Sequence, residues 1–161
     1  MKILVAVDGS ENSDRAVHYA GTILKDAADA KITLFHVLNA LPPELLEHGG
    51  SENPATEATL GAQLRKDQEA WLQQERESKG GILTKARDIL AKAGVDTHRI
   101  SLTFGHEEDV ARNILEEART GGYSTVVVGR HGDSRIKRFF GGGVTDQLLS
   151  ECTGLTIWIV E

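Results

Sequence analysis

Short apolar runs alternate with amphipathic segments along most of the chain. The runs lie at residues 3–7, 32–38, 100–104, 125–128 and 155–160. Most are nearly continuous in apolar residues, which is typical of strands that are covered on both faces of a sheet. Residues 16–27 have apolar side chains at helical spacing, with Ser10 or Ser13 as the N-cap. This alternation predicts a single α/β domain over residues 1–161, with an open, doubly wound, mostly parallel sheet and helices on both faces.

The chain between residues 39 and 93 departs from the alternation. Residues 39–56 contain all three prolines and few apolar side chains, which predicts a long loop. Residues 59–93 are charged and helical in composition, and the pair Gly80-Gly81 interrupts them. Because glycine disfavours the interior of a helix, we expect a first helix, a break at this pair and a second helix that docks on the sheet. One long bent helix is the alternative.

Net charge and cysteine content narrow the classes of function and location. The formal net charge of −6 argues against general binding to nucleic acid or to an anionic membrane surface. No apolar stretch approaches the roughly 20 residues that a membrane span requires, and the N-terminal run is too short for the core of a signal peptide. Cys152 is the only cysteine, so an intrachain disulfide is impossible and a reducing compartment is favoured. We therefore expect a cytoplasmic protein.

A basic loop rich in glycine follows the fourth apolar run. Gly129 opens this loop, and residues 141–143 close it with three further glycines. The basic residues between them are Arg130, Arg135, Lys137 and Arg138. Glycine lets backbone N–H groups approach an anion closely, and a helix predicted from Val144 would direct its positive end to the same place. The loop therefore predicts a phosphate site, whereas the alternative is a turn with a solvated basic face.

Asp8 directly follows the first apolar run. It lies at a second place where we expect a ligand to bind. In open doubly wound sheets, ligands bind beyond the carboxyl ends of the strands, where the strand order reverses. The commonest orders place the end of the first strand beside this crevice, so Asp8 is a candidate ligand residue. The alternative is that Asp8 caps the first helix or its turn.

Several motifs of nucleotide-binding and catalytic proteins are absent from the sequence. Residues 8–13 lack the spaced glycines of a dinucleotide fingerprint and the Gly-Lys-Ser/Thr of a P-loop. The six histidines show no spacing typical of metal ligands, and no nucleophile elbow Gly-x-Ser-x-Gly occurs. We therefore predict no catalytic side chains and no metal ion held by the protein itself.

Three spaced glycines follow the fourth apolar run. Gly129, Gly132 and Gly142 come after a Val-Val-Val strand end, with two and nine residues between successive glycines. This spacing resembles the ATP-binding signature of the universal stress protein family. Further landmarks of that family are matched by residues 5–10, 34–37 and 105–108. The resemblance covers nearly the whole chain. It implies a Rossmann-like, five-stranded parallel sheet in the order 3-2-1-4-5, homodimers and, in one subclass, bound ATP.

Carried over by position, the resemblance implies a site for an adenine nucleotide, with ATP as the ligand. The adenine and ribose would contact Ala6, Val7, Asp8 and Val37. The ribose would also contact Val128 and Gly129, and Arg130 would flank the sugar and the phosphates. The phosphates would contact Gly132, Gly142, Gly143, Val144 and Thr145. A Mg²⁺ or Mn²⁺ ion, where one accompanies ATP, would be held mainly by the phosphates.

Gly143 stands where the family signature has Ser or Thr, so a hydroxyl donor to the phosphates is lost although the backbone N–H remains. The resemblance implies a nucleotide-binding or signalling module of the stress response, whose downstream protein partner the sequence does not name. One alternative is a dimeric interaction protein with an empty pocket, as in the subclass without ATP. The other is a slow ATPase in which Asp8 positions a metal ion and a water molecule, although no P-loop lysine, carboxylate pair or evident base accompanies it.

The last apolar run gives a prediction about assembly. Residues 155–160 would form a strand at the edge of the sheet, with Ile157 and Ile159 on one face and Trp158 on the other. An exposed edge of this kind is an aggregation hazard unless it is covered or paired. Pairing with its own copy about a two-fold axis satisfies the edge, so we predict a homodimer through the C-terminal strand. Shielding of the edge within the monomer is the alternative.

Overall fold

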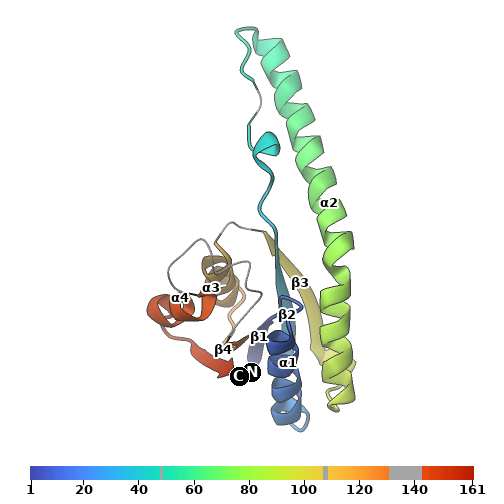
Figure 1. Ribbon diagram of the computed structural model, residues 1–161, viewed down its shortest axis with the longest axis vertical. Helices are drawn as coiled ribbons and strands as arrows, with labels where there is room; N and C mark the ends of the chain where they lie inside the picture. Colours follow the sequence, from blue (N-terminus) through green and yellow to red (C-terminus); the bar gives the residue numbers. More distant parts are fainter. Residues whose placement is uncertain (48, 107–108, 131–142) are drawn as a thin grey trace.

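The computed structural model describes residues 1–47, 49–106, 109–130 and 143–161. The described residues form a five-stranded parallel sheet in the order β3-β2-β1-β4-β5 (Figure 1). The strands are β1 (Lys2–Ala6), β2 (Lys31–Leu38), β3 (Ile100–His106), β4 (Thr125–Gly129) and β5 (Thr156–Val160). The predicted fold class, an open doubly wound sheet in the order 3-2-1-4-5, is confirmed.

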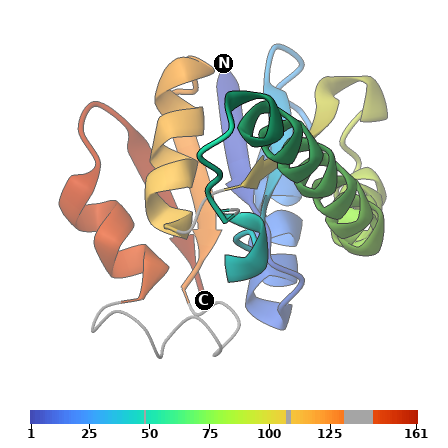
Figure 2. The ribbon, with the colours of Figure 1, turned by 90° about the horizontal axis from the view of Figure 1, so that it is seen from above.

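Helices cover both faces of this sheet (Figure 2). The helices are α1 (Glu11–Leu24), α2 (Pro54–Lys92), α3 (Val110–Thr120) and α4 (Val144–Glu151), and two short 3₁₀ turns are η1 (Pro43–Leu45) and η2 (Thr97–Arg99). α1 and α2 pack on one face, and α3 and α4 pack on the other. No helix in the described part of the chain is both long and apolar enough to cross a membrane.

Successive strand residues point alternately into two separate cores. The core under α1 and α2 contains Ile3, Val5, Ile32, Leu34 and Val127 from the strands, with Ala16, Val17, Ala20, Leu83, Ala86 and Leu90 from the helices. The core under α3 and α4 contains Leu4, Phe35, Val126 and Val128, with Ala111, Ile114, Leu115, Ala118 and Leu148. Burial of each large side chain stabilises the fold by about 1.5–3 kcal/mol. The central strands are apolar on both faces because both faces are buried.

α2 is one continuous helix of 39 residues that runs through Gly80 and Gly81. The expected break at this glycine pair is wrong, and the alternative of one long helix is correct. Two interior glycines destabilise a helix by about 1 kcal/mol each relative to alanine. The buried side chains that follow the pair are Leu83, Ala86 and Leu90. Their packing in the core offsets a penalty of this size, so tertiary contacts override the local preference.

The first part of α2 extends beyond the rest of the fold together with the chain that leads to it from β2 (Figure 1). We call residues 39–47 and 49–82 the arm. No side chain of α2 within the arm is fully buried. Gln68 Nε2 donates a hydrogen bond to the carbonyl of Leu45 at 2.7 Å, and Asn39 Nδ2 donates to Glu75 Oε1 at 2.6 Å. These bonds hold parts of the predicted loop against the helix.

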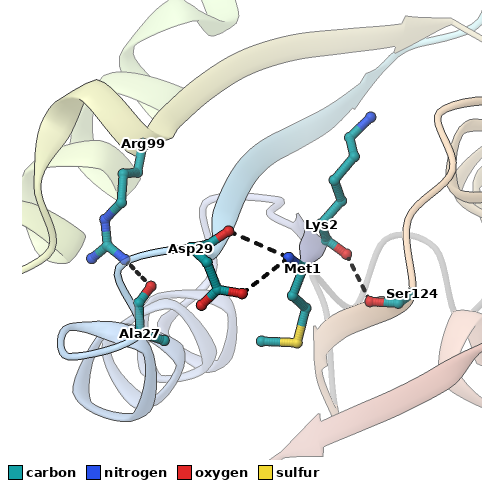
Figure 3. Close-up of polar contacts among 6 residues, drawn as sticks. All are labelled: Met1, Lys2, Ala27, Asp29, Arg99 and Ser124. Atoms are coloured by element: carbon teal, nitrogen blue, oxygen red, sulfur yellow. Dashed lines mark hydrogen bonds and ion pairs between the residues drawn. The ribbon is translucent and has the colours of Figure 1, made fainter.

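Polar contacts fix both ends of α1. Ser10 is its N-cap, because Ser10 Oγ accepts a hydrogen bond from the Ser13 N–H at 3.1 Å. At the other end the Arg99 guanidinium donates to the carbonyls of Leu24, Lys25 and Ala27, and Figure 3 shows the contact with Ala27. Of the two candidate caps, the structure therefore selects Ser10.

The amino ends of the strands are joined by further polar contacts (Figure 3). The ammonium group of Met1 lies 3.5 Å from Asp29 Oδ2, and Ser124 Oγ donates to the carbonyl of Lys2 at 3.1 Å. The ion pair is exposed and contributes little, about 0–1 kcal/mol. The candidate ligand residues lie at the opposite edge of the sheet, where the strands have their carboxyl ends.

Candidate functional site

The described candidate residues gather at the carboxyl ends of β1, β2 and β4 and at the start of α4. β1 pairs with β2 on one side and with β4 on the other, so these three strand ends are neighbours. β1 contributes Ala6 and leads into Val7 and Asp8, β2 contributes Val37, and β4 contributes Val128 and Gly129 and leads into Arg130. α4 begins with Gly143, Val144 and Thr145. Gly132 and Gly142 lie outside the described residues.

A partly exposed apolar surface lies at this edge. Ala6, Val37, Val110 and Val144 are half-buried and pack against the core under α3 and α4. We call these four residues the apolar floor. They come from β1, β2, α3 and α4, and Val128 lies buried in the same cluster at 4% exposure. A flat apolar ligand could cover this surface, as is typical of ligand sites at the switch point of α/β sheets.

Val7 does not contribute its side chain to the apolar floor. The Val7 side chain is 5% exposed and packs into the core under α1 and α2, on the opposite face of the sheet. The Val7 carbonyl accepts a hydrogen bond from His36 Nδ1 at 2.7 Å, and its N–H donates to the carbonyl of Phe35. Both main-chain polar groups of Val7 are therefore engaged within the fold.

His36 is a buried polar side chain whose role the sequence did not indicate. It is 7% exposed, and its ring packs edge-on against Phe104 with centroids 6.2 Å apart. Burial lowers the pKa of His36, although the hydrogen bond to the Val7 carbonyl acts in the opposite direction. His36 is thus neutral near pH 7, and its Nδ1–H joins the end of β2 to the end of β1.

Asp8 shapes the turn between β1 and α1. Asp8 Oδ1 accepts a hydrogen bond from the Ser10 N–H at 3.0 Å, and the Asp8 N–H donates to Ser13 Oγ at 3.2 Å. An aspartate that accepts from the backbone two residues later is typical of a turn that leads into a helix. Asp8 Oδ1 therefore stabilises the turn before α1, as the alternative for Asp8 stated. Binding of a ligand by Asp8 remains a prediction.

Gly129 and Arg130 have structural roles at the end of β4. A Cβ atom on Gly129 would lie 2.8 Å from the carbonyl carbon and oxygen of Asn12, so only glycine allows β4 to approach α1 this closely. The Arg130 N–H donates to the Val160 carbonyl at 2.8 Å, which extends the ladder to β5. The Arg130 guanidinium pairs with Glu161 in an exposed contact. Such a pair is weak, so it leaves the arginine available to an anion.

The start of α4 has no side-chain cap in the described part of the chain. Gly143 is the N-cap residue, and a Cβ atom there would meet no described atom within 4 Å. Thr145 Oγ1 donates to the carbonyl of Arg130 at 3.1 Å and ties the helix to the end of β4. Because the first N–H groups of a helix lack intrahelical partners, this helix end can accept an anion through its backbone.

Asp109 joins α3 to α4 beside the apolar floor. Asp109 is the N-cap of α3 and accepts hydrogen bonds from the Arg112 N–H at 3.0 Å and from Gln147 Nε2 at 2.8 Å. Burial acts to raise the pKa of Asp109, but these hydrogen bonds outweigh it and the pKa is lowered.

Metal-ligating side chains do not cluster in the parts of the chain that the structure describes. No group of three His, Cys, Asp or Glu residues there could hold a metal ion. The chemistry available at the described edge is therefore an apolar surface, backbone N–H groups and the side chains of Asp8 and Arg130.

The fold and this edge can now be compared with known proteins. Residues 1–154 match the universal stress protein family. A solved universal stress protein in complex with cAMP is 22% identical, with a TM-score of 0.64 over 100% of this chain and 96% of that chain. The universal stress protein from Archaeoglobus fulgidus in complex with dAMP is 15% identical, with a TM-score of 0.60 over 100% and 98% of the two chains.

A third solved structure, the universal stress protein UspA from Lactobacillus plantarum, is 16% identical and has a TM-score of 0.62 over 100% of this chain and 97% of that chain. Comparison with curated proteins gives no significant match. The structural likeness at these identities shows the fold, and the family match spans almost the full sequence. The chain belongs to the universal stress protein family.

Proposed function

We propose that this protein binds an adenine nucleotide, with ATP as the expected ligand, at the edge formed by β1, β2, β4 and α4. The observation that carries the proposal is the apolar floor beside the start of α4, where no side chain of the described residues is a cap. An aromatic base needs an apolar surface, and a phosphate group needs N–H donors and positive potential. Two similar proteins of known structure are in complex with cAMP and with dAMP, which share the adenine base.

The described residues fit the separate parts of such a ligand. The base would cover Ala6, Val37, Val110 and Val144 and replace water on this half-buried surface. The phosphates would lie near the N–H groups of Val144 and Thr145, within reach of Arg130. Asp8 would accept from the ribose hydroxyl groups. Gly132 and Gly142 are proposed to contribute backbone N–H groups, in the manner that the family signature implies.

The proposed role is that of a cytoplasmic module whose nucleotide occupancy is signalled to a partner protein in a stress response. Binding to the folded state alone stabilises that state by mass action, by about 2.7 kcal/mol at a ligand concentration of 100 Kd. Nucleotide binding would therefore alter the stability of the carboxyl ends of the strands. The arm also begins there, directly after β2. This is a binding function, and hydrolysis is proposed to be slow or absent.

Calorimetric titration with ATP tests the proposal through the variant Val37→Asp. A carboxylate on the apolar floor would repel the phosphates and resist burial beneath the base, so affinity should fall at least about tenfold. Leu102→Asp is the matched control, because Leu102 is 40% exposed on β3 and faces the other side of the sheet. An equal loss of ATP affinity in both variants would contradict the proposed location of the site. Unchanged ATP affinity in a folded Val37→Asp variant would contradict it as well.

The edge strand β5 supports a second part of the proposal, a homodimer. Tyr19, Ile23 and Ile159 are 49%, 50% and 38% exposed, and they line an open hollow together with Trp158, Val160 and Glu161. Such a patch beside a sheet edge is typical of an interaction surface. We propose that a second copy covers it, and the dimeric interaction protein without a nucleotide remains the competing function because it uses the same surface.

A further inference from the structure

Asn113 on α3 has a buried oxygen that the fold leaves without a partner. Asn113 Oδ1 is inaccessible to solvent and accepts no hydrogen bond from any residue that the structure describes. Ile114, which follows it, and Ala111, two residues before it, belong to the core under α3 and α4. A buried acceptor without a donor destabilises a fold, and most such groups in proteins are paired. An apolar side chain there would not carry this penalty.

The Asn113 amide occupies the place of the missing side chain at Gly105. A Cβ atom on Gly105 would lie 1.9 Å from Asn113 Oδ1 and 2.4 Å from Phe35 Cζ. Gly105 is directly opposite Val37 in the ladder between β2 and β3. The amide therefore lies about one strand spacing, roughly 4.8 Å, from the apolar floor. Val110 of the floor lies one turn before Asn113 on the same helix.

The neighbours of the amide favour an oxygen in this position. The Cα–H groups of Gly105 and the ring edge of Phe35 carry partial positive charge, which attracts an oxygen rather than an NH₂ group. Gly105 and Phe35 lie against the amide. A donor on the floor could approach from the side of Val37, which is opposite Gly105, and of Val110, one turn away on α3. The terminal torsion of asparagine is broad, so a small rotation turns the oxygen toward that side.

We propose that Asn113 is a specificity-determining residue that selects a 6-aminopurine over a 6-oxopurine. Its Oδ1 accepts a hydrogen bond from the exocyclic amino group of the base on the apolar floor. A 6-oxopurine would place its own oxygen against Oδ1, leaving the buried acceptor unpaired beside a second acceptor. The inference rests on the proposed nucleotide site and adds to it the atom that recognises the base.

The experiment compares the dissociation constants of ATP and inosine triphosphate, which differ in the amino group at position 6. The wild-type protein should bind ATP about tenfold more tightly than inosine triphosphate. Asn113→Leu removes the acceptor and should bring the ratio close to one, without loss of thermal stability. Asn113→Ala serves as a second variant if the leucine variant fails to fold.

Asn39→Leu is the matched control, because it removes an asparagine at the end of β2 whose amide already donates to Glu75. That variant should keep the wild-type ratio. An unchanged ratio in folded Asn113→Leu would overturn the inference and leave the nucleotide site standing. Preference of the wild-type protein for inosine triphosphate would overturn it as well, because the amide would then present its NH₂ group. Absence of binding to either nucleotide would overturn both the inference and the proposed function.

Discussion

Gly143→Ser should add a hydroxyl group at the start of α4 without disturbing the backbone. Gly143 has φ −68° and ψ 166°, close to the values of −75° and 160° at Ser10, the N-cap of α1. A Cβ atom on Gly143 would meet no atom of the described residues within 4 Å. Ser10 Oγ accepts from the N–H three residues later, so the introduced serine should share the Asp146 N–H, which already donates to the Gly143 carbonyl at 2.9 Å. Its hydroxyl proton then remains available to an anion.

Stability and affinity should change by different amounts. Glycine and serine are both tolerated N-caps, so the free energy of unfolding should rise by only a few tenths of a kcal/mol, about 1 °C in Tm. A hydrogen bond from the hydroxyl to a phosphate oxygen is charge-assisted and contributes roughly 1.5–3 kcal/mol at most. We therefore expect ATP affinity to increase about tenfold.

Calorimetric titration with ATP measures the affinity, and thermal unfolding measures the stability. Gly143→Ala is the matched control, because it adds the same Cβ atom without a hydroxyl and replaces glycine by a poorer N-cap. The alanine variant should bind ATP no better than the wild-type protein and should be slightly less stable. Equal ATP affinity in all three proteins would refute the reasoning, since the N-cap side chain would then not face the phosphates.

Three further outcomes follow from the described geometry. Gly129→Ala should destabilise the protein by about 1–3 kcal/mol in thermal unfolding, because the new Cβ would lie 2.8 Å from the Asn12 backbone; a neutral effect would show that β4 and α1 separate easily. Trp158→Lys should weaken the proposed dimer in sedimentation equilibrium by placing a charge at the seam, and a wild-type monomer at micromolar concentration would rule out that assembly. The lowered pKa of Asp109 means that its ionised form stabilises the fold above the unfolded-chain value of about 3.9, and that this contribution is lost as the pH falls through the lower folded value. The difference in free energy of unfolding between the wild-type protein and Asp109→Asn should thus be constant above about pH 5 and shrink below about pH 4. A difference that grows on acidification would show that folding raises the pKa of Asp109 instead of lowering it.

The sheet could be predicted from the sequence because its strands are buried on both faces. The three valines at residues 126–128 have no polar side to expose, which limits this run to an interior strand between layers of helices. The same runs predict where the strands end. The sequence therefore predicts that Asp8 and Gly129 lie at the same edge of the sheet. The strand order came from the family resemblance and is confirmed.

Contacts between distant elements were beyond the sequence pattern. Gly80 and Gly81 predicted a helix break, but the packing of Leu83 and the residues after it keeps α2 continuous. From the sequence, Gly129 was interpreted as part of a phosphate-binding loop. The structure shows that the close approach of α1 to β4 already requires a glycine at this position. The sequence pattern did not identify Asn113 as a candidate site residue, because its position matters only through the contact between its amide and Gly105 on β3. Spacing along one element does not encode such pairings.

The arm gives the molecule an elongated shape, with consequences for how it moves in solution. A helix of 39 residues is about 58 Å long, whereas a compact chain of 161 residues has a radius of gyration of about 15 Å. Friction on the arm slows diffusion, so gel filtration alone would assign a monomer too large a mass. Small-angle scattering should give a radius of gyration above the compact value, and a nucleotide that altered the arm would change that radius without changing the mass.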